Sequence, residues 1–154
     1  MSINSKLKEL NITLSAPATP AAAYVMYTQT GNLVFLSGHI AKKTDGTVDT
    51  GVCGRDKTTE QAKEAAQRIG VALISTLHQA CDGELDRVKR IVKVMSLVAS
   101  TSDFTEQHLV TNGCSELLGA VFGDSGKHAR SAFGVPSLPQ GACVEIELIA
   151  EIAS

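Results

Sequence analysis

One arginine near the C-terminus stands where it could bind a small anion. Arg130 is followed by the small residues Ser131 and Ala132, which leave open space around a guanidinium group. The planar fork of an arginine side chain suits bidentate capture of a carboxylate. The structural alternative is an ion pair between Arg130 and an acidic residue of the same sheet. Both interpretations are compatible with the residue pattern.

Three glutamates further along the chain could supply a proton acceptor. Glu145, Glu147 and Glu151 alternate with apolar residues, so they share one face of a strand. A carboxylate beside a bound substrate can take a proton from an attacking water molecule. A solvated strand face has the same pattern and is the structural alternative. The spacing alone leaves both open.

The sequence lacks the common signatures of other chemistries. It has no phosphate-binding loop, no dinucleotide fingerprint and no nucleophile elbow, and its four histidines lack the spacing of metal ligands. Its four cysteines lie at wide intervals, which predicts free thiols rather than disulfides or a zinc site. These absences predict no metal site and no dinucleotide cofactor.

The length, net charge and hydropathy of the chain predict its domain count, its location and the kinds of partner it can bind. The chain has 154 residues and a net charge of -2, and its only dense basic cluster spans residues 87–93, so we expect no nucleic-acid partner. Residues 1–15 lack the continuous apolar stretch of a secretory signal, and no segment approaches the length of a membrane span. We expect a single domain over residues 1–154, located in the cytoplasm, with residues 1–23 as an N-terminal arm.

The elements that must position these residues can be read from their periodicity. A β-hairpin is predicted from residues 24–29 and 33–36, which flank a Gly-Asn turn. A long amphipathic helix begins at a capping box, Thr58 with Gln61, and ends before Gly83. A second helix, capped by Asp103 with Glu106, runs to Gly123.

Three further strands complete the expected fold. They are predicted at residues 91–99, 129–135 and 143–152, which gives the order β-β-α-β-α-β-β. This order predicts an α+β sandwich, a mixed sheet with two helices packed on one face. Because the helices cover only one side, the other face must be wet or meet another subunit, and the apolar residues of the strands favour a subunit interface.

Several motifs together resemble the reactive-intermediate deaminase family, also called Rid or YjgF-like. They are Tyr24, Gly31-Asn32-Leu33-Val34-Phe35, Ser37-Gly38, Ala129-Arg130-Ser131, Leu138-Pro139 and Val144-Glu145-Ile146-Glu147. The order of helices and strands agrees as well, so the resemblance covers nearly the whole chain. It implies a chorismate-mutase-like fold, a homotrimer, and sites between subunits that hydrolyse 2-aminoacrylate and related imino acids.

The resemblance also implies a role for each matching residue. Arg130 would bind the substrate carboxylate, and Glu145 would position or activate the attacking water. Ser37 and Gly38 would line the pocket. Two further residues complete the set: Tyr24 would come from across the interface, and Asn112, on the second helix, matches the family's pocket asparagine.

The sequence departs from the family pattern at three places. Ala132 stands where many deaminases carry cysteine, His39 replaces a common glutamine, and the region of the second helix is longer, which resembles a divergent branch. The alternative functions are a trimer that binds small carboxylates without turning them over and, with less support, an endoribonuclease.

Overall fold

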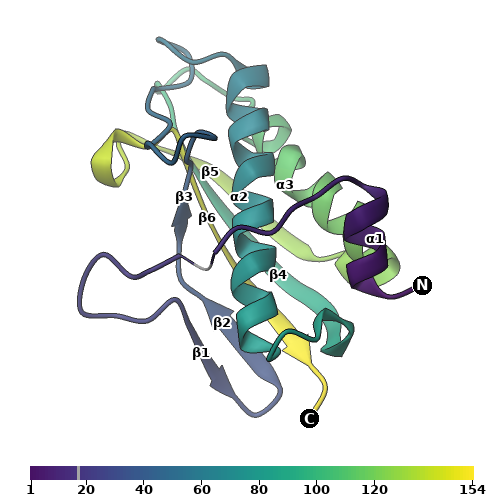
Figure 1. The fold of residues 1–154 in the computed structure, drawn as a ribbon. Helices are drawn as coiled ribbons and strands as arrows, with labels where there is room; N and C mark the ends of the chain where they lie inside the picture. Colours follow the sequence, from purple (N-terminus) through teal and green to yellow (C-terminus); the bar gives the residue numbers. More distant parts are fainter. Residues whose placement is uncertain (17) are drawn as a thin grey trace.

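A computed structural model describes residues 1–16 and 18–154 of the chain. Its core is one mixed sheet in the order β1-β2-β6-β4-β5, with the short β3 paired to β6 (Figure 1). The strands are β1 Tyr27–Thr30, β2 Leu33–Leu36, β3 His39–Ile40, β4 Val88–Ala99, β5 Ala129–Val135 and β6 Val144–Ile152. Among the described strands, β4 and β5 pair in parallel and the other pairs are antiparallel, and the sheet order places β5 at an edge beside β4, the longest strand.

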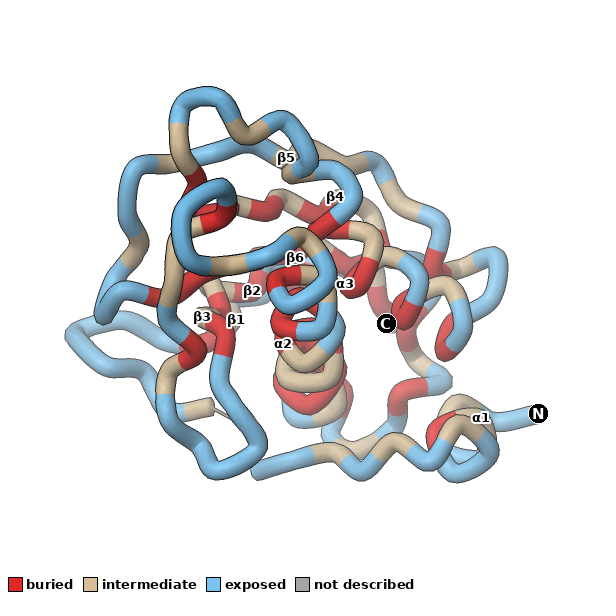
Figure 2. The backbone as a smooth tube through the Cα atoms, turned by 90° about the horizontal axis from the view of Figure 1, so that it is seen from above, coloured by how far each residue is buried: buried red, intermediate tan, exposed pale blue. Residues whose placement is uncertain are grey.

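Two long helices, α2 (Thr59–Ala80) and α3 (Gln107–Phe122), cover one face of this sheet. The predicted capping box of α2 is present: Thr58 accepts from the Gln61 amide, and the Gln61 side chain accepts from the Thr58 amide. Seen from above, α2 lies between the strands and the N-terminal segment (Figure 2). The predicted α+β architecture with two helices on one face is confirmed.

The structure adds elements that the sequence pattern did not predict. A short helix, α1 (Ile3–Glu9), forms within the predicted N-terminal arm, and its Ser2 cap accepts from the Ser5 amide. Three 3₁₀ turns follow later, η1 (Leu85–Arg87), η2 (Gly123–Gly126) and η3 (Pro139–Gly141). Residues 24–26 precede β1 rather than belonging to it.

The predicted cap of the second helix is wrong. The hydroxyl of Thr101 donates to the Asp103 carboxylate over 2.6 Å, so Asp103 closes a turn before the helix. Glu106 occupies the cap position of α3 without a side-chain cap bond. A side chain that hydrogen-bonds locally in a turn no longer serves the helix terminus.

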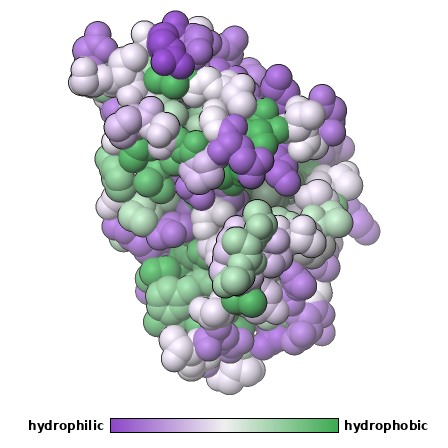
Figure 3. Space-filling view, turned by 90° about the vertical axis from the view of Figure 1, so that its left-hand side faces the viewer, coloured by the Kyte–Doolittle hydropathy of each residue, from purple (hydrophilic) through white to green (hydrophobic). Residues whose placement is uncertain are grey.

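Strand β6 separates the two faces of the sheet. Every second residue from Val144 to Ile152 is buried beneath the helices, and the residues between them are half-buried on the opposite face. That opposite face also carries the exposed apolar side chains Leu33, Phe35 and Phe133. From the side that carries β1 and β3, hydrophobic side chains gather mainly in the left half of the view (Figure 3).

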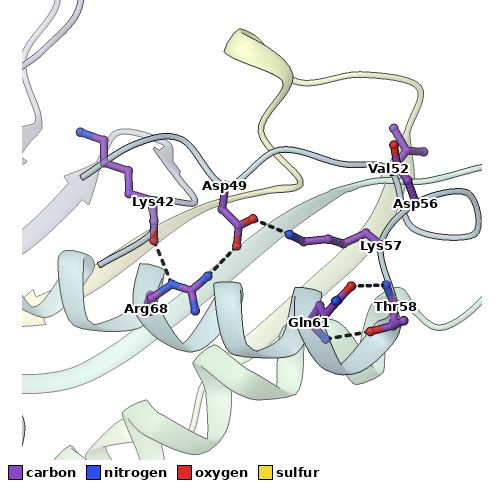
Figure 4. A network of polar contacts seen from close by, with 8 residues as sticks. All are labelled: Lys42, Asp49, Val52, Asp56, Lys57, Thr58, Gln61 and Arg68. Atoms are coloured by element: carbon purple, nitrogen blue, oxygen red, sulfur yellow. Dashed lines mark hydrogen bonds and ion pairs between the residues drawn. The ribbon is translucent and has the colours of Figure 1, made fainter. Parts of the chain in front are cut away.

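A buried ion-pair network fixes the long loop between β3 and α2. Asp49, 3% exposed, forms ion pairs with Lys57 of the loop and with Arg68 of α2. The Arg68 Nε also donates to the Lys42 carbonyl over 2.9 Å (Figure 4). The Asp49 carbonyl accepts from the Cys143 amide, so the same loop holds the start of β6 in place.

The cysteine side chains lie in the core. All four cysteines are free and buried. Burial raises the pKa of Cys114 to about 12 and that of Cys143 to about 11, so neither thiol is a ready nucleophile.

In the part of the chain that the structure describes, the helices are too short or too polar to cross a bilayer.

Candidate functional site

The structure divides the predicted site residues between two places. Arg130 lies with Asn112 at the edge of the sheet, whereas Glu145 lies with Ser37 and Gly38 near β3. The two groups are built by different elements. We call them the Arg130 cluster (Arg130, Asn112, Ser115 and His128) and the Glu145 cluster (Glu145, Gly38, Ser37 and His39).

In the Arg130 cluster, helix α3 holds the guanidinium from one side. The Arg130 Nη1 donates to the Asn112 side-chain oxygen over 2.8 Å, and its Nη2 donates to the His108 carbonyl over 3.4 Å. Arg130 is paired in register with Val94 of β4, which is buried beneath the helices. Neighbours in register point to the same face, so Arg130 leans over the edge of the sheet toward α3.

Two further residues of this cluster escaped sequence reasoning. The Ser115 hydroxyl lies 3.3 Å from the Arg130 Nη1 and 2.9 Å from the His128 Nε2, and the His128 Nδ1 is 2.6 Å from the Gly126 carbonyl oxygen. Burial lowers the pKa of His128, and the positive charge of Arg130 lowers it further. The sequence contains one indication of Ser115: it follows Asn112 by three residues, so the two side chains share a helix face.

The Glu145 cluster is built around a close approach of the Gly38 backbone to the Glu145 side chain. A Cβ atom at Gly38 would lie only 2.5 Å from the Glu145 Oε1, so the absence of a side chain at Gly38 makes room for the carboxylate. Burial raises the pKa of Glu145, and the negative charge of Glu147 raises it further. The half-buried Glu145 carboxylate therefore holds its proton to a higher pH than an exposed glutamate does.

His39 and Ser37 fix the backbone around Gly38. His39 is 4% exposed, its Nδ1 lies 2.7 Å from the Ser37 carbonyl oxygen, and its Nε2 lies 2.8 Å from the Thr76 hydroxyl of α2. The Ser37 hydroxyl donates to the Val25 carbonyl over 2.6 Å. Tyr24, the residue before that carbonyl, is 46% exposed and belongs to neither cluster.

The side chains of Arg130 and Glu145 point to opposite sides of the sheet. Glu145 lies between Val144 and Ile146, which are buried beneath the helices, so its side chain points to the helix-free face. Arg130, by contrast, contacts α3 on the helix side. One chain therefore does not bring Arg130 and Glu145 into a common pocket.

Among the described residues, Arg130 has none of the acidic partners that a structural role in an ion pair would require. None of the ion pairs formed by the described residues includes Arg130, whose recorded acceptors are all uncharged. The positive charge of the guanidinium is therefore available to bind an anionic ligand. Within residues 1–16 and 18–154, no cluster of three or more His, Cys, Asp or Glu side chains has the arrangement of a metal site.

Comparisons with known proteins agree with this architecture. The family model described as Endoribonuclease L-PSP matches residues 13–152. Protein TCP17 of Trypanosoma cruzi is 41% identical over 97% of this chain and 94% of its own length. The crystal structure of Atu1372 from Agrobacterium tumefaciens, a protein of unknown function, is 41% identical, with a TM-score of 0.90 over 99% of this chain and 94% of that one.

A more distant structure shows how far this chain diverges. RidA from the Antarctic bacterium Psychrobacter sp. PAMC 21119 is 27% identical and covers 89% of this chain and 94% of its own, with a TM-score of 0.52. The divergent branch predicted from the longer helix region stays a prediction.

Proposed function

The chain belongs to the Endoribonuclease L-PSP (YjgF/Rid) family, and on this basis we propose that it hydrolyses small 2-imino and enamine acids to 2-keto acids and ammonia. The observation that carries the proposal is Arg130, a half-buried arginine without an acidic partner among the described residues. A charge kept half-buried without a partner is costly for a structural role and useful for an anionic ligand.

The free edge of the Arg130 fork fits a carboxylate. A guanidinium has five N–H groups, and three of those of Arg130 are engaged, two on Nη1 and one on Nη2. The two that remain belong to Nε and Nη2. These nitrogens form one side of the fork, which matches the two oxygens of a carboxylate.

The reaction makes modest demands on the protein. Water adds to the electrophilic carbon of the protonated imine and gives a carbinolamine, and the carbon–nitrogen bond of this intermediate then breaks to release ammonia and leave the keto group. An enamine first takes a proton at carbon to become the imine. Glu145 would accept the proton of the attacking water and return it to the leaving nitrogen, a task suited to a carboxylate with a raised pKa.

A complete site would require two copies of the chain. Arg130 and Glu145 lie on opposite faces of the sheet, so a substrate held by the first meets the second only across an interface. The helix-free face exposes Leu33, Phe35 and Phe133, which suits burial against another subunit. We therefore propose the homotrimer implied by the family, with Tyr24, Ser37 and Gly38 lining clefts between subunits.

The test compares 2-iminobutyrate hydrolysis by the wild type and by Arg130→Ala. One charge-assisted hydrogen bond is worth about 1.5–3 kcal/mol, so we expect kcat/KM to fall at least roughly tenfold. Arg55→Ala is the matched control, because Arg55 is exposed and pairs only with its neighbour Asp56. Circular dichroism checks the fold of each variant.

The outcomes separate the proposal from its alternative. A wild type that does not accelerate hydrolysis over buffer contradicts the proposed activity. If that protein still binds a 2-keto acid and Arg130→Ala abolishes binding, the chain is a carboxylate-binding trimer instead.

An RNA substrate has weaker physical support. Two of the four cationic side chains in the basic cluster at residues 87–93 form ion pairs, Arg87 with Asp82 and Arg90 with Glu151, and Lys93 donates to the Ser131 hydroxyl. Phosphate backbones are bound by clustered and available positive charge. Ribonuclease activity that survives repurification and is lost in Arg130→Ala would reverse this assessment.

A further inference from the structure

The contacts around His128 define the direction of each hydrogen bond. The Gly126 carbonyl can only accept, so the His128 Nδ1, 2.6 Å away, carries the hydrogen. In the neutral imidazole the Nε2 then accepts, and the Ser115 hydroxyl, 2.9 Å away, must donate to it. Burial and the charge of Arg130 both lower the pKa of His128, so the ring is neutral at neutral pH.

This direction leaves the Ser115 oxygen as an acceptor for Arg130. The hydroxyl proton is turned toward His128, and the lone pairs of the oxygen face the Arg130 Nη1 at 3.3 Å. The other hydrogen of Nη1 is taken by Asn112 at 2.8 Å. Both hydrogens of Nη1 are thus fixed by α3.

We infer that Ser115 and His128 are positioning residues that orient the Arg130 guanidinium so that its Nε and Nη2 edge faces the substrate carboxylate. The inference rests on the proposed function and deepens it. Arginine has a long side chain with many rotamers, and an anchor of this kind binds well only when its orientation is fixed in advance.

The choice of residue types supports a positioning role. A helical serine without an outside acceptor turns its proton to the carbonyl four residues earlier, here that of Thr111. His128 provides a competing acceptor and so sets the direction of the hydroxyl. Alanine at position 115 would remove the acceptor for Nη1, whereas threonine would keep a hydroxyl.

The experiment measures imine hydrolysis and binding of the product analogue 2-oxobutyrate for the wild type, Ser115→Ala, Ser115→Thr and His128→Phe. We expect Ser115→Ala to raise both KM and the Kd for 2-oxobutyrate by roughly fivefold to tenfold, the effect of losing one ordinary hydrogen bond that orients Arg130. Its kcat should change less than twofold, because Arg130 holds the carboxylate equally in the ground and transition states. Ser115→Thr should recover most of the affinity, and His128→Phe should lose less than Ser115→Ala.

The matched control is Ser75→Ala. Ser75 is a buried helical serine whose hydroxyl donates only to the Val71 carbonyl of α2 and touches neither cluster. The same deletion there should leave KM and Kd unchanged. A nitrogen-15 NMR spectrum should also show His128 as the neutral Nδ1–H tautomer.

Three results would overturn the inference, and they are distinguishable. Wild-type KM and Kd in a folded Ser115→Ala variant would refute the positioning role and leave the proposed function intact. An Nε2–H tautomer of His128 at neutral pH would refute the hydrogen-bond direction. A wild type that neither hydrolyses 2-iminobutyrate nor binds 2-oxobutyrate would remove the proposed function and this inference with it.

Discussion

The Arg130 cluster and the Glu145 cluster are supported by histidines in the same way. Each ring places its Nδ1 on the carbonyl oxygen two residues earlier, Gly126 for His128 and Ser37 for His39. Each ring also places its Nε2 within 2.9 Å of a hydroxyl on a covering helix. The two histidine rings thus make matching contacts, and the clusters differ in the role of the hydroxyl group that each ring contacts.

The two hydroxyl groups, those of Thr76 and Ser115, have different further neighbours. Thr76, the partner of His39, is buried and lies 3.3 Å from the Ala72 carbonyl of its own helix, so that network ends inside the core. Ser115, the partner of His128, faces the Arg130 guanidinium. One histidine therefore fixes backbone and contributes to stability, whereas the other fixes a side chain that would bind the substrate.

The largest effect that tests this comparison is expected from Glu145→Gln. Removal of the proton acceptor should lower kcat by about 10²-fold or more, with little change in KM, the reverse of the pattern expected for Ser115→Ala. Steady-state kinetics with 2-iminobutyrate measure both values. A Glu145→Gln variant with wild-type kcat would exclude Glu145 as the base.

The pH dependence of kcat provides a second test of Glu145 as the base. A base acts when deprotonated, so kcat should fall as the pH drops through the pKa of Glu145, which lies above its usual 4.5. Glu147→Gln removes the neighbouring charge that helps to raise that pKa, and it should shift the acid limb to lower pH without abolishing turnover.

A smaller loss is expected from Gly38→Ala. The new Cβ would lie 2.5 Å from the Glu145 Oε1, and the flexible carboxylate would move away from the substrate. Because a misplaced catalytic group loses much of its effect, we expect kcat to fall roughly tenfold while the fold persists. Gly119→Ala is the control, because a Cβ at Gly119 in α3 meets nothing within 4 Å and should leave kcat unchanged.

The elements of this fold could be predicted where the sequence signal is periodic. The alternation of β6, the capping box at Thr58 and the buried stripe of α2 are local patterns, and the structure confirms them. Helix α1 has only 7 residues and contributes one buried side chain, Leu7, so it left no comparable pattern. Its docking depends on contacts such as the Ile3 amide with Asp86, which lie far apart in sequence.

The candidate site was predictable only in part, for the same reason. Arg130 and Asn112 were predicted from motifs, and the structure places them in contact, although their roles remain predictions. Ser115 and His128 belong to no motif and are recognised only when α3 and β5 are seen side by side. The separation of Arg130 from Glu145 on opposite faces depends on sheet register, which residue types alone do not reveal.

A moderate effect on stability should distinguish the two histidines. His39→Ala leaves the Ser37 carbonyl and the Thr76 hydroxyl without their buried partner, which should cost about 1–3 kcal/mol of unfolding free energy. His128→Ala should lower stability less, because its partner Ser115 is only half-buried and its hydroxyl remains accessible to water. Urea unfolding of both variants measures the difference, and equal losses would contradict the contrast between core and site.

The smallest expected effect is a dependence of stability on pH. Burial lowers the pKa of His39 below its ordinary 6.5 in the folded state, so near and just below pH 6.5 the unfolded chain binds more protons. The unfolding free energy should therefore rise as the pH increases toward 6.5 and level off above it. Glu145, with a raised pKa, gives the opposite slope above its usual 4.5, so the measurement is best made in a Glu145→Gln background. His39→Gln should flatten the remaining slope more than His128→Gln, because desolvation is the leading cause of both shifts and His39 is the more deeply buried ring.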